Sequence, residues 1–251
     1  MPGLVLLGLA AAATLAAVPG PTADEVIARS VEAQGGLQRI RAVQTVRMTG
    51  SMSAGAMEMP MTLEFKRPSR IRAEQTVRGQ RTVQGYDGRR AWVIPPGGRR
   101  AEALPPEAVA QMAQRADFEG PLVDYKAKGS QAELVGRERL EQGDAYRIKL
   151  THADGQSEFY LVDARSWLLV RVEAKRTVQG RVIDGETTLS GYRESGGWKW
   201  PMLIESSVKG MPEQTITFSG IEVNLPLDDT RFQMPAAAPQ GSVQRPSDSP
   251  R

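Results

Sequence analysis

Residues 57–65 have the sequence Met57-Glu58-Met59-Pro60-Met61-Thr62-Leu63-Glu64-Phe65, and this stretch decides the fold class. Apolar side chains occupy every second position, and polar residues or proline lie between them. Because side chains alternate across a β-strand, the stretch predicts a strand with one apolar and one polar face. Methionine supplies three of the five apolar side chains, and its flexible thioether adapts to apolar partners of variable shape. The pattern favours a surface that binds something hydrophobic, although an ordinary half-buried strand would show the same alternation.

Short strands continue along most of the chain after residue 43. Turn signals such as Ala54-Gly55, Asp87-Gly88 and Gly196-Gly197 separate them. The expected strands are 43–53, 57–66, 70–78, 81–86, 89–95, 131–139, 144–152, 156–163, 167–177, 181–193, 197–208 and 213–223. Sequential strands that are joined by short turns form antiparallel sheets, so we expect a mainly β fold.

Two helical segments precede the strands. The segment Thr22-Ala23-Asp24-Glu25 has the pattern of a capping box and predicts a helix that begins there. Gly35-Gly36 ends this helix. The spacing of Leu37, Ile40 and Val43 then indicates a short second helical turn.

A third helix interrupts the run of strands. Its start is favoured by Pro105-Pro106-Glu107, because proline suits the first turn of a helix. Apolar residues follow at helical spacing and then extend the apolar surface beyond the helix: Val109, Met112, Ala113, Ala116, Phe118, Leu122 and Val123. This helix either covers an opening of the sheet as a lid or fills a core.

Both ends of the chain differ in composition from its middle. Residues 4–18 are uncharged and rich in leucine and alanine, which is typical of a secretory signal peptide, although no Lys or Arg precedes them. Residues 236–251 are rich in Ala, Pro, Ser and Gln without periodicity. We therefore expect a signal peptide over 1–20, one domain over 21–235 and a disordered tail over 236–251. The mature protein would be soluble and, in a Gram-negative cell, periplasmic.

The composition excludes several kinds of chemistry. The 251 residues include no cysteine and one histidine, His152, which excludes disulfides, thiol catalysis and cysteine-ligated zinc. No phosphate-binding loop, zinc-protease motif or serine-hydrolase motif is present. Asp184 and Glu186 flank a glycine, but two carboxylates fall short of the roughly six to eight oxygen ligands of calcium. We expect a protein that is not an enzyme and has neither a cofactor nor a metal site.

Basic residues are concentrated in residues 66–100. The formal net charge of the whole chain is +3, whereas this window holds ten basic and two acidic residues, which is ten minus two, or +8. Such a patch could attract anionic lipid headgroups or an acidic partner, or it could be a solvated outer strand face. The few aromatic residues do not alternate with the arginines as a base-stacking platform requires, so we do not expect nucleic acid as a partner.

Three segments together resemble one known family. Leu63-Glu64-Phe65-Lys66-Arg67-Pro68 is followed by Tyr86-Asp87-Gly88-Arg89-Arg90-Ala91-Trp92, and Asp228-Asp229-Thr230-Arg231-Phe232-Gln233-Met234-Pro235 lies near the end. In their order and spacing these segments resemble the LolA-like outer-membrane lipoprotein-sorting superfamily, which also includes LolB and the lipoprotein sensor RseB. The resemblance covers about residues 22–235, but this chain has neither the anchor cysteine of LolB nor the second domain of RseB.

The resemblance implies a fold and a function. The implied fold is a curved, incompletely closed antiparallel half-barrel, here of about 11 strands, with an N-terminal helix and an inserted lid helix on its concave side. Members carry the acyl chains of lipoproteins or other lipids between membranes. In LolA an arginine of the K-R-P motif holds the lid closed, and this position is Arg67 here. A guanidinium suits such a role because its five donors can satisfy the free carbonyls of a helix end.

We therefore expect a carrier that binds acyl chains in a hydrophobic hollow and moves them toward the outer membrane. The alternative is an envelope lipid-binding sensor or assembly module that does not transport. A monomer is expected, with transient contacts to donor and acceptor proteins of the membranes. The residues expected to contact lipid are Met57, Met59, Met61, Leu63, Phe65, Ile71, Trp92, Val109, Met112, Phe118 and Leu122, with Arg67 gating the lid.

Overall fold

The structure is a computed structural model that describes residues 20–178 and 181–236. The expected signal peptide and C-terminal tail lie outside the described residues, apart from Gly20 and Ala236. Within the described ranges no helix combines the length and the apolar composition that a membrane crossing would require.

Fifteen strands form in the described part of the chain. They are β1 Thr45–Ala54, β2 Met57–Lys66, β3 Arg70–Val77, β4 Gln80–Tyr86, β5 Ala91–Ile94, β6 Glu102–Ala103, β7 Gln131–Leu140, β8 Gly143–Thr151, β9 Ser157–Asp163, β10 Leu169–Val178, β11 Arg181–Ser190, β12 Arg193–Ser195, β13 Trp198–Trp200, β14 Leu203–Val208 and β15 Gln214–Val223. All twelve expected segments contain strands. The number is higher than expected because two segments divide, at Gly191 and at Pro201, and because β6 is added.

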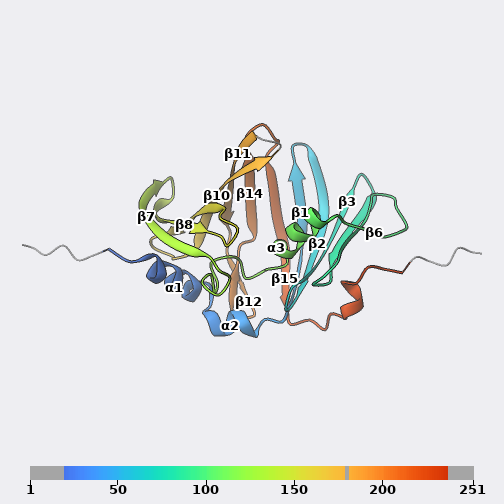
Figure 1. The fold of residues 1–251 in the computed structure, drawn as a ribbon, viewed down its shortest axis with the longest axis horizontal. Helices are drawn as coiled ribbons and strands as arrows, with labels where there is room; N and C mark the ends of the chain where they lie inside the picture. Colours follow the sequence, from blue (N-terminus) through green and yellow to red (C-terminus); the bar gives the residue numbers. More distant parts are fainter. Residues whose placement is uncertain (1–19, 179–180, 237–251) are drawn as a thin grey trace, which may run out of the picture.

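Thirteen of these strands form one antiparallel sheet in the order β6-β5-β4-β3-β2-β1-β15-β14-β11-β10-β9-β8-β7. The two edge strands, β6 and β7, do not pair with each other, so the sheet stays open (Figure 1). β12 and β13 form a separate hairpin. The predicted class, a mainly β and incompletely closed half-barrel, is confirmed.

The helices begin and end where the sequence indicates. They are α1 Ala23–Gln34, α2 Leu37–Ala42, α3 Pro106–Arg115 and a short 3-10 helix, η1 Asp229–Arg231. Thr22 and Glu25 form the predicted capping box of α1, and Gly35 ends that helix with a φ of 137°. Pro105 and Pro106 start α3 as predicted.

Two apolar clusters lie on one face of the sheet, which we call the inner face. The first contains Phe65, Ile71 and Phe218 of the sheet together with Met112 of α3 and Ile40 of α2. The second packs Val26 and Ile27 of α1 against strands β8 to β10. Thus α3 covers one end of the inner face and α1 covers the other (Figure 1).

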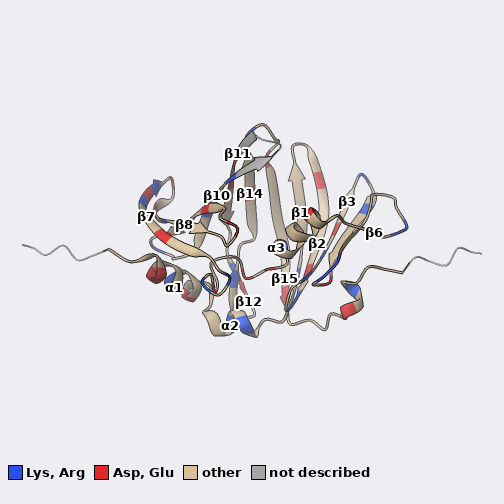
Figure 2. Cartoon of the chain, viewed as in Figure 1, with Lys and Arg blue, Asp and Glu red and all other residues tan. Residues whose placement is uncertain are grey.

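The opposite, outer face holds the C-terminal segment by charge. The Glu64 side chain is 1% exposed, and its carboxylate accepts hydrogen bonds from Arg47 at 3.0 Å and from Arg231 at 2.8 and 2.9 Å. Asp229 pairs with Lys66 at 2.7 Å, so acidic and basic residues lie together at this C-terminal turn (Figure 2). A buried carboxylate that is fully hydrogen-bonded fixes η1 against the sheet.

Replacement of Glu64 by Ala is expected to lower the free energy of unfolding by about 2–4 kcal/mol. This loss is close to the cost of removing one partner of a buried ion pair. It is somewhat smaller because the arginine side chains are partly exposed to water. Urea denaturation measures the free energy of unfolding of each variant. Glu58→Ala, on the same strand and the same face but exposed, should change stability by less than about 0.5 kcal/mol. Equal losses in the two variants would contradict this account of the outer face.

Candidate functional site

One apolar row crosses the middle of the inner face. The strand register pairs Met59 with Met52, Met52 with Ile216, Ile216 with Ile204 and Ile204 with Leu189. These five residues, which we call the central row, lie on the adjacent strands β2, β1, β15, β14 and β11. Four strand spacings of about 4.8 Å make the row about 19 Å long. The row is therefore long enough for an extended acyl chain to lie across the strands.

The central row is only partly covered. Met59 is 6% exposed, whereas the other four side chains are half-buried. The next row toward the strand tips contains Met57, Ala54, Gln214, Ser206 and Thr187 and is also uncharged. Ile204 and Ile216 pack at the margin of the first cluster, whereas neither cluster includes Met52 or Leu189. A half-exposed apolar strip without charge is therefore left between α3 and α1.

Beneath α3 the inner face is filled by side chains. Met112 is 3% exposed, and Phe118, just after the helix, packs on Phe65 with ring centroids 5.7 Å apart and on Trp198 at 6.0 Å. Val109 also packs against this cluster. The space beneath α3 is thus occupied by the protein's own side chains, so here the helix fills a core.

Arg67 ties this closed arrangement together. Its guanidinium donates to the backbone carbonyls of Ile40 at 2.9 Å and Val43 at 2.7 Å, which lie at the C-terminal end of α2. It also donates to the carboxylate of Glu119 at 2.5 Å and lies over the ring of Phe118, 5.0 Å from its centroid. One side chain therefore satisfies free carbonyls of α2 and holds the segment that follows α3.

The structure brings together most of the residues that were expected to contact lipid. Leu63, Phe65, Ile71, Val109, Met112 and Phe118 belong to the cluster beneath α3. Met57, Met59 and Met61 continue the same face of β2 toward the strand tip. Leu122 instead packs in the cluster beneath α1.

Trp92 does not share this face. In the register it lies opposite Gly85, which pairs in turn with Arg72 of the outer face, and its indole N–H donates to the Phe232 carbonyl at 2.8 Å. A Cβ on Gly85 would lie 2.3 Å from the Trp92 ring, so glycine makes room for the indole. Trp92 therefore holds the C-terminal segment and is removed from the lipid-facing set.

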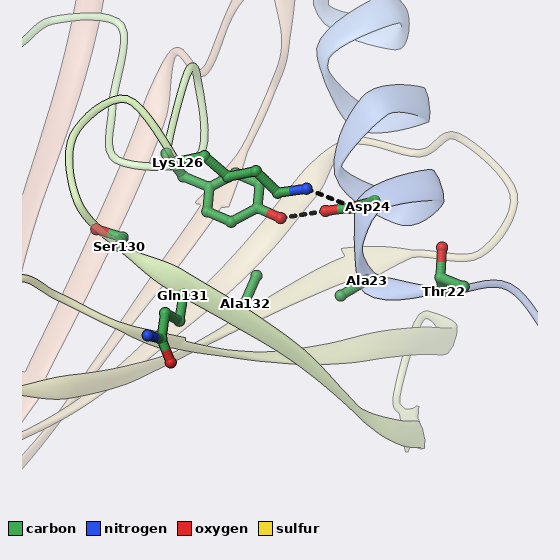
Figure 3. A pocket seen from close by; sticks show the side chains of 8 residues that line it. Thr22, Ala23, Asp24, Lys126, Ser130, Gln131 and Ala132 are labelled. Carbon is green, nitrogen blue, oxygen red and sulfur yellow. Dashed lines mark hydrogen bonds and ion pairs between the residues drawn. The ribbon is translucent and has the colours of Figure 1, made fainter.

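A surface hollow of about 350 Å³ lies elsewhere, at the start of α1 (Figure 3). Asp24 accepts hydrogen bonds there from Lys126, at 2.6 Å, and from the hydroxyl of Tyr125. The bonds from Lys126 and Tyr125 lower the pKa of Asp24, and burial followed by the bond to Asp24 raises the pKa of Tyr125. The hollow is open and polar, and its charges pair with each other, so it does not fit an acyl chain.

Half of the basic residues of the 66–100 window pair with acidic residues of the protein. Asp229 pairs with Lys66 and Arg70, and Glu74 pairs with Arg72 and Arg81. Arg67 pairs with Glu119. Half of the ten basic residues therefore hold the fold together, which weakens the case for a continuous anion-binding patch. Within residues 20–178 and 181–236, no group of three or more His, Cys, Asp or Glu is placed to hold a metal ion.

Sequence reasoning missed four members of the central row: Met52, Leu189, Ile204 and Ile216. Met52 and Ile216 lie in strands with clear alternation, whereas the adjacent apolar pairs Val182-Ile183 and Leu203-Ile204 interrupt it in β11 and β14. Their alignment depends on the pairing of β1 with β15, strands that lie far apart in the sequence. Only the three-dimensional register shows that they form one line.

Three solved structures share this architecture. A LolA superfamily protein from Nitrosomonas europaea has a TM-score of 0.56 at 18% sequence identity, covering 85% of this chain and 98% of that one. A domain of an outer membrane lipoprotein-sorting protein, described as putative, from Vibrio parahaemolyticus has a TM-score of 0.56 at 11% identity, with coverage of 83% and 94%. A DUF1329 family protein from Desulfovibrio piger has a TM-score of 0.57 at 13% identity, with coverage of 84% and 97%.

Sequence comparison adds nothing to this likeness. No protein-family model matches the chain, and no curated protein sequence matches it. At the identities found, the likeness concerns the fold rather than the function. The chain has the LolA-like fold.

Proposed function

We propose that this protein binds the acyl chains of lipids or lipoproteins on its inner face and carries them through the periplasm toward the outer membrane. The observation that carries the proposal is the central row, an uncharged apolar strip that no helix covers fully. The LolA-like fold supports the same reading, because one of the similar structures is described as a lipoprotein-sorting domain. The protein would act as a monomer, without catalysis, and would meet donor and acceptor proteins only transiently.

The closed position of α3 fits reversible binding. Burial of an acyl chain stabilises a complex by about 0.8 kcal/mol per CH₂ group, so a permanently open apolar trough would bind too tightly to release its cargo. When α3 closes, Met112 and Phe118 bury the same inner face in the free protein. An acyl chain that extends from the central row to beneath α3 has to displace these side chains, which offsets part of the gain from burial.

Replacement of Ile204 by Asp is expected to abolish binding of a fluorescent phospholipid, because a charge on the central row would face the acyl chain. Titration followed by fluorescence measures the affinity. Ile204 is the better test position than Met61, whose side chain is 6% exposed and whose replacement by Asp would unfold the protein.

Leu203→Asp is the matched control. Leu203 is the neighbouring residue, also half-buried, but it lies on the outer face. Leu203→Asp should reduce stability about as much as Ile204→Asp does and should leave lipid affinity unchanged. If Ile204→Asp binds lipid as the wild type does, the central row is not the binding surface.

Replacement of Glu119 by Ala is expected to increase lipid affinity about tenfold. The variant removes a charge-assisted bond that holds the closed segment, and such a bond contributes about 1.5–3 kcal/mol in a partly buried site. The bonds from Arg67 to α2 remain, so the fold should survive. The measurement is the dissociation constant of the same lipid.

Glu141→Ala, an exposed carboxylate in the β7–β8 turn, is the control and should bind as the wild type does. Unchanged or weaker binding by Glu119→Ala would show that the Arg67–Glu119 pair does not restrain uptake. Transfer of labelled lipid between inner- and outer-membrane vesicles then separates a carrier from a protein that only binds, since a sensor would bind lipid without accelerating transfer.

A further inference from the structure

Beneath α3 the inner face also carries hydrogen-bonding groups. α3 contacts β3, β4 and β5. On this face Gln75 lies directly opposite Thr82, and Gln84 is the next inner-face residue along β4. We call these three residues the polar trio. All are half-buried, and they lie on two of the strands that α3 contacts.

The trio has no internal partners. The hydroxyl oxygen of Thr82 is buried and accepts or donates no hydrogen bond. Within the described residues the side chains of Gln75 and Gln84 also bond to no other residue. A buried hydroxyl without a partner destabilises a fold, and native structures retain such groups rarely and for a reason.

The chemistry of the surroundings restricts what could pair with the trio. Every inner-face position of these two strands is uncharged: Ile71, Ala73, Gln75 and Val77 on β3, and Gln80, Thr82, Gln84 and Tyr86 on β4. Threonine and glutamine donate as well as accept hydrogen bonds, and neither compensates a charge. A neutral carbonyl attached to an apolar chain therefore fits these two strands, whereas a carboxylate would find no counter-ion on them.

We propose that the polar trio binds the ester or amide carbonyl of an acylated lipid once α3 has moved aside. This inference rests on the proposed function and names the class of its cargo, neutral acyl esters or amides. The acyl chain would lie on the methionine-rich side of the inner face, since Met61 is the neighbour of Gln75 in the register. The unpaired hydroxyl of Thr82 would gain its partner in the complex.

The test uses three pyrene ligands of equal chain length: pyrenedodecane, methyl pyrenedodecanoate and pyrenedodecanoic acid. The wild type should bind the methyl ester about tenfold more tightly than the alkane, and also more tightly than the acid. Thr82→Val should bring the affinities for the ester and the alkane to within about twofold of each other. The same variant should raise the melting temperature, because it removes a buried polar group without a partner.

Two controls make the result specific to the hydroxyl. Thr82→Ser keeps the hydroxyl and should keep the preference for the ester. Thr76→Val makes the same change on the outer face of β3, also at a half-buried position, and should not alter the preference.

The outcomes separate this inference from the proposed function. If the wild type binds none of the three ligands, the proposed function fails. If it binds ester and alkane equally, or prefers the acid, or if Thr82→Val keeps the preference for the ester, only the assignment of the polar trio is overturned.

Discussion

The structure depends on one constraint: a single antiparallel sheet of thirteen strands that does not close. An open, curved sheet presents an inner face that needs cover, because strand alternation places most of the apolar side chains on it. The chain covers parts of that face with α1 on one side and with α3, α2 and the β12–β13 hairpin on the other. The central row is left half-exposed, and this is the surface on which the proposed guest would bind.

One side chain connects the helices that flank the inner face. Arg67 joins the end of α2 to the segment after α3, through two carbonyls and one carboxylate. The carbonyl bonds stabilise the body of the protein, and the bond to Glu119 stabilises the closed cover. Because the two sets of partners are separate, the closed state can be weakened without loss of the scaffold. The outer face has the complementary task, since its ion pairs around Glu64 keep the C-terminal segment in place while the inner face changes.

Much of the fold could be predicted from the sequence. Turn signals delimited twelve strand segments, the capping box located α1, and the proline pair located α3, because these signals are local. Arg67 was expected to satisfy carbonyls at a helix end, and it does so. Trp92 was assigned to the wrong face because the turn before β5, rather than composition, sets which side chains point inward. Leu122 and Val123 are neighbours in sequence but pack in different clusters, a division that composition does not reveal. The central row escaped prediction because it depends on pairing between distant strands.

The most direct test of the account is the position of the bound acyl chain. A phospholipid with a diazirine at mid-chain, bound to the protein and activated by light, labels the residues that the chain touches, and peptide mass spectrometry identifies them. The account predicts labels on the strands of the central row, at Met52, Leu189, Ile204 or Ile216. Labels confined to the outer face, or to the polar hollow beside Asp24, would contradict it.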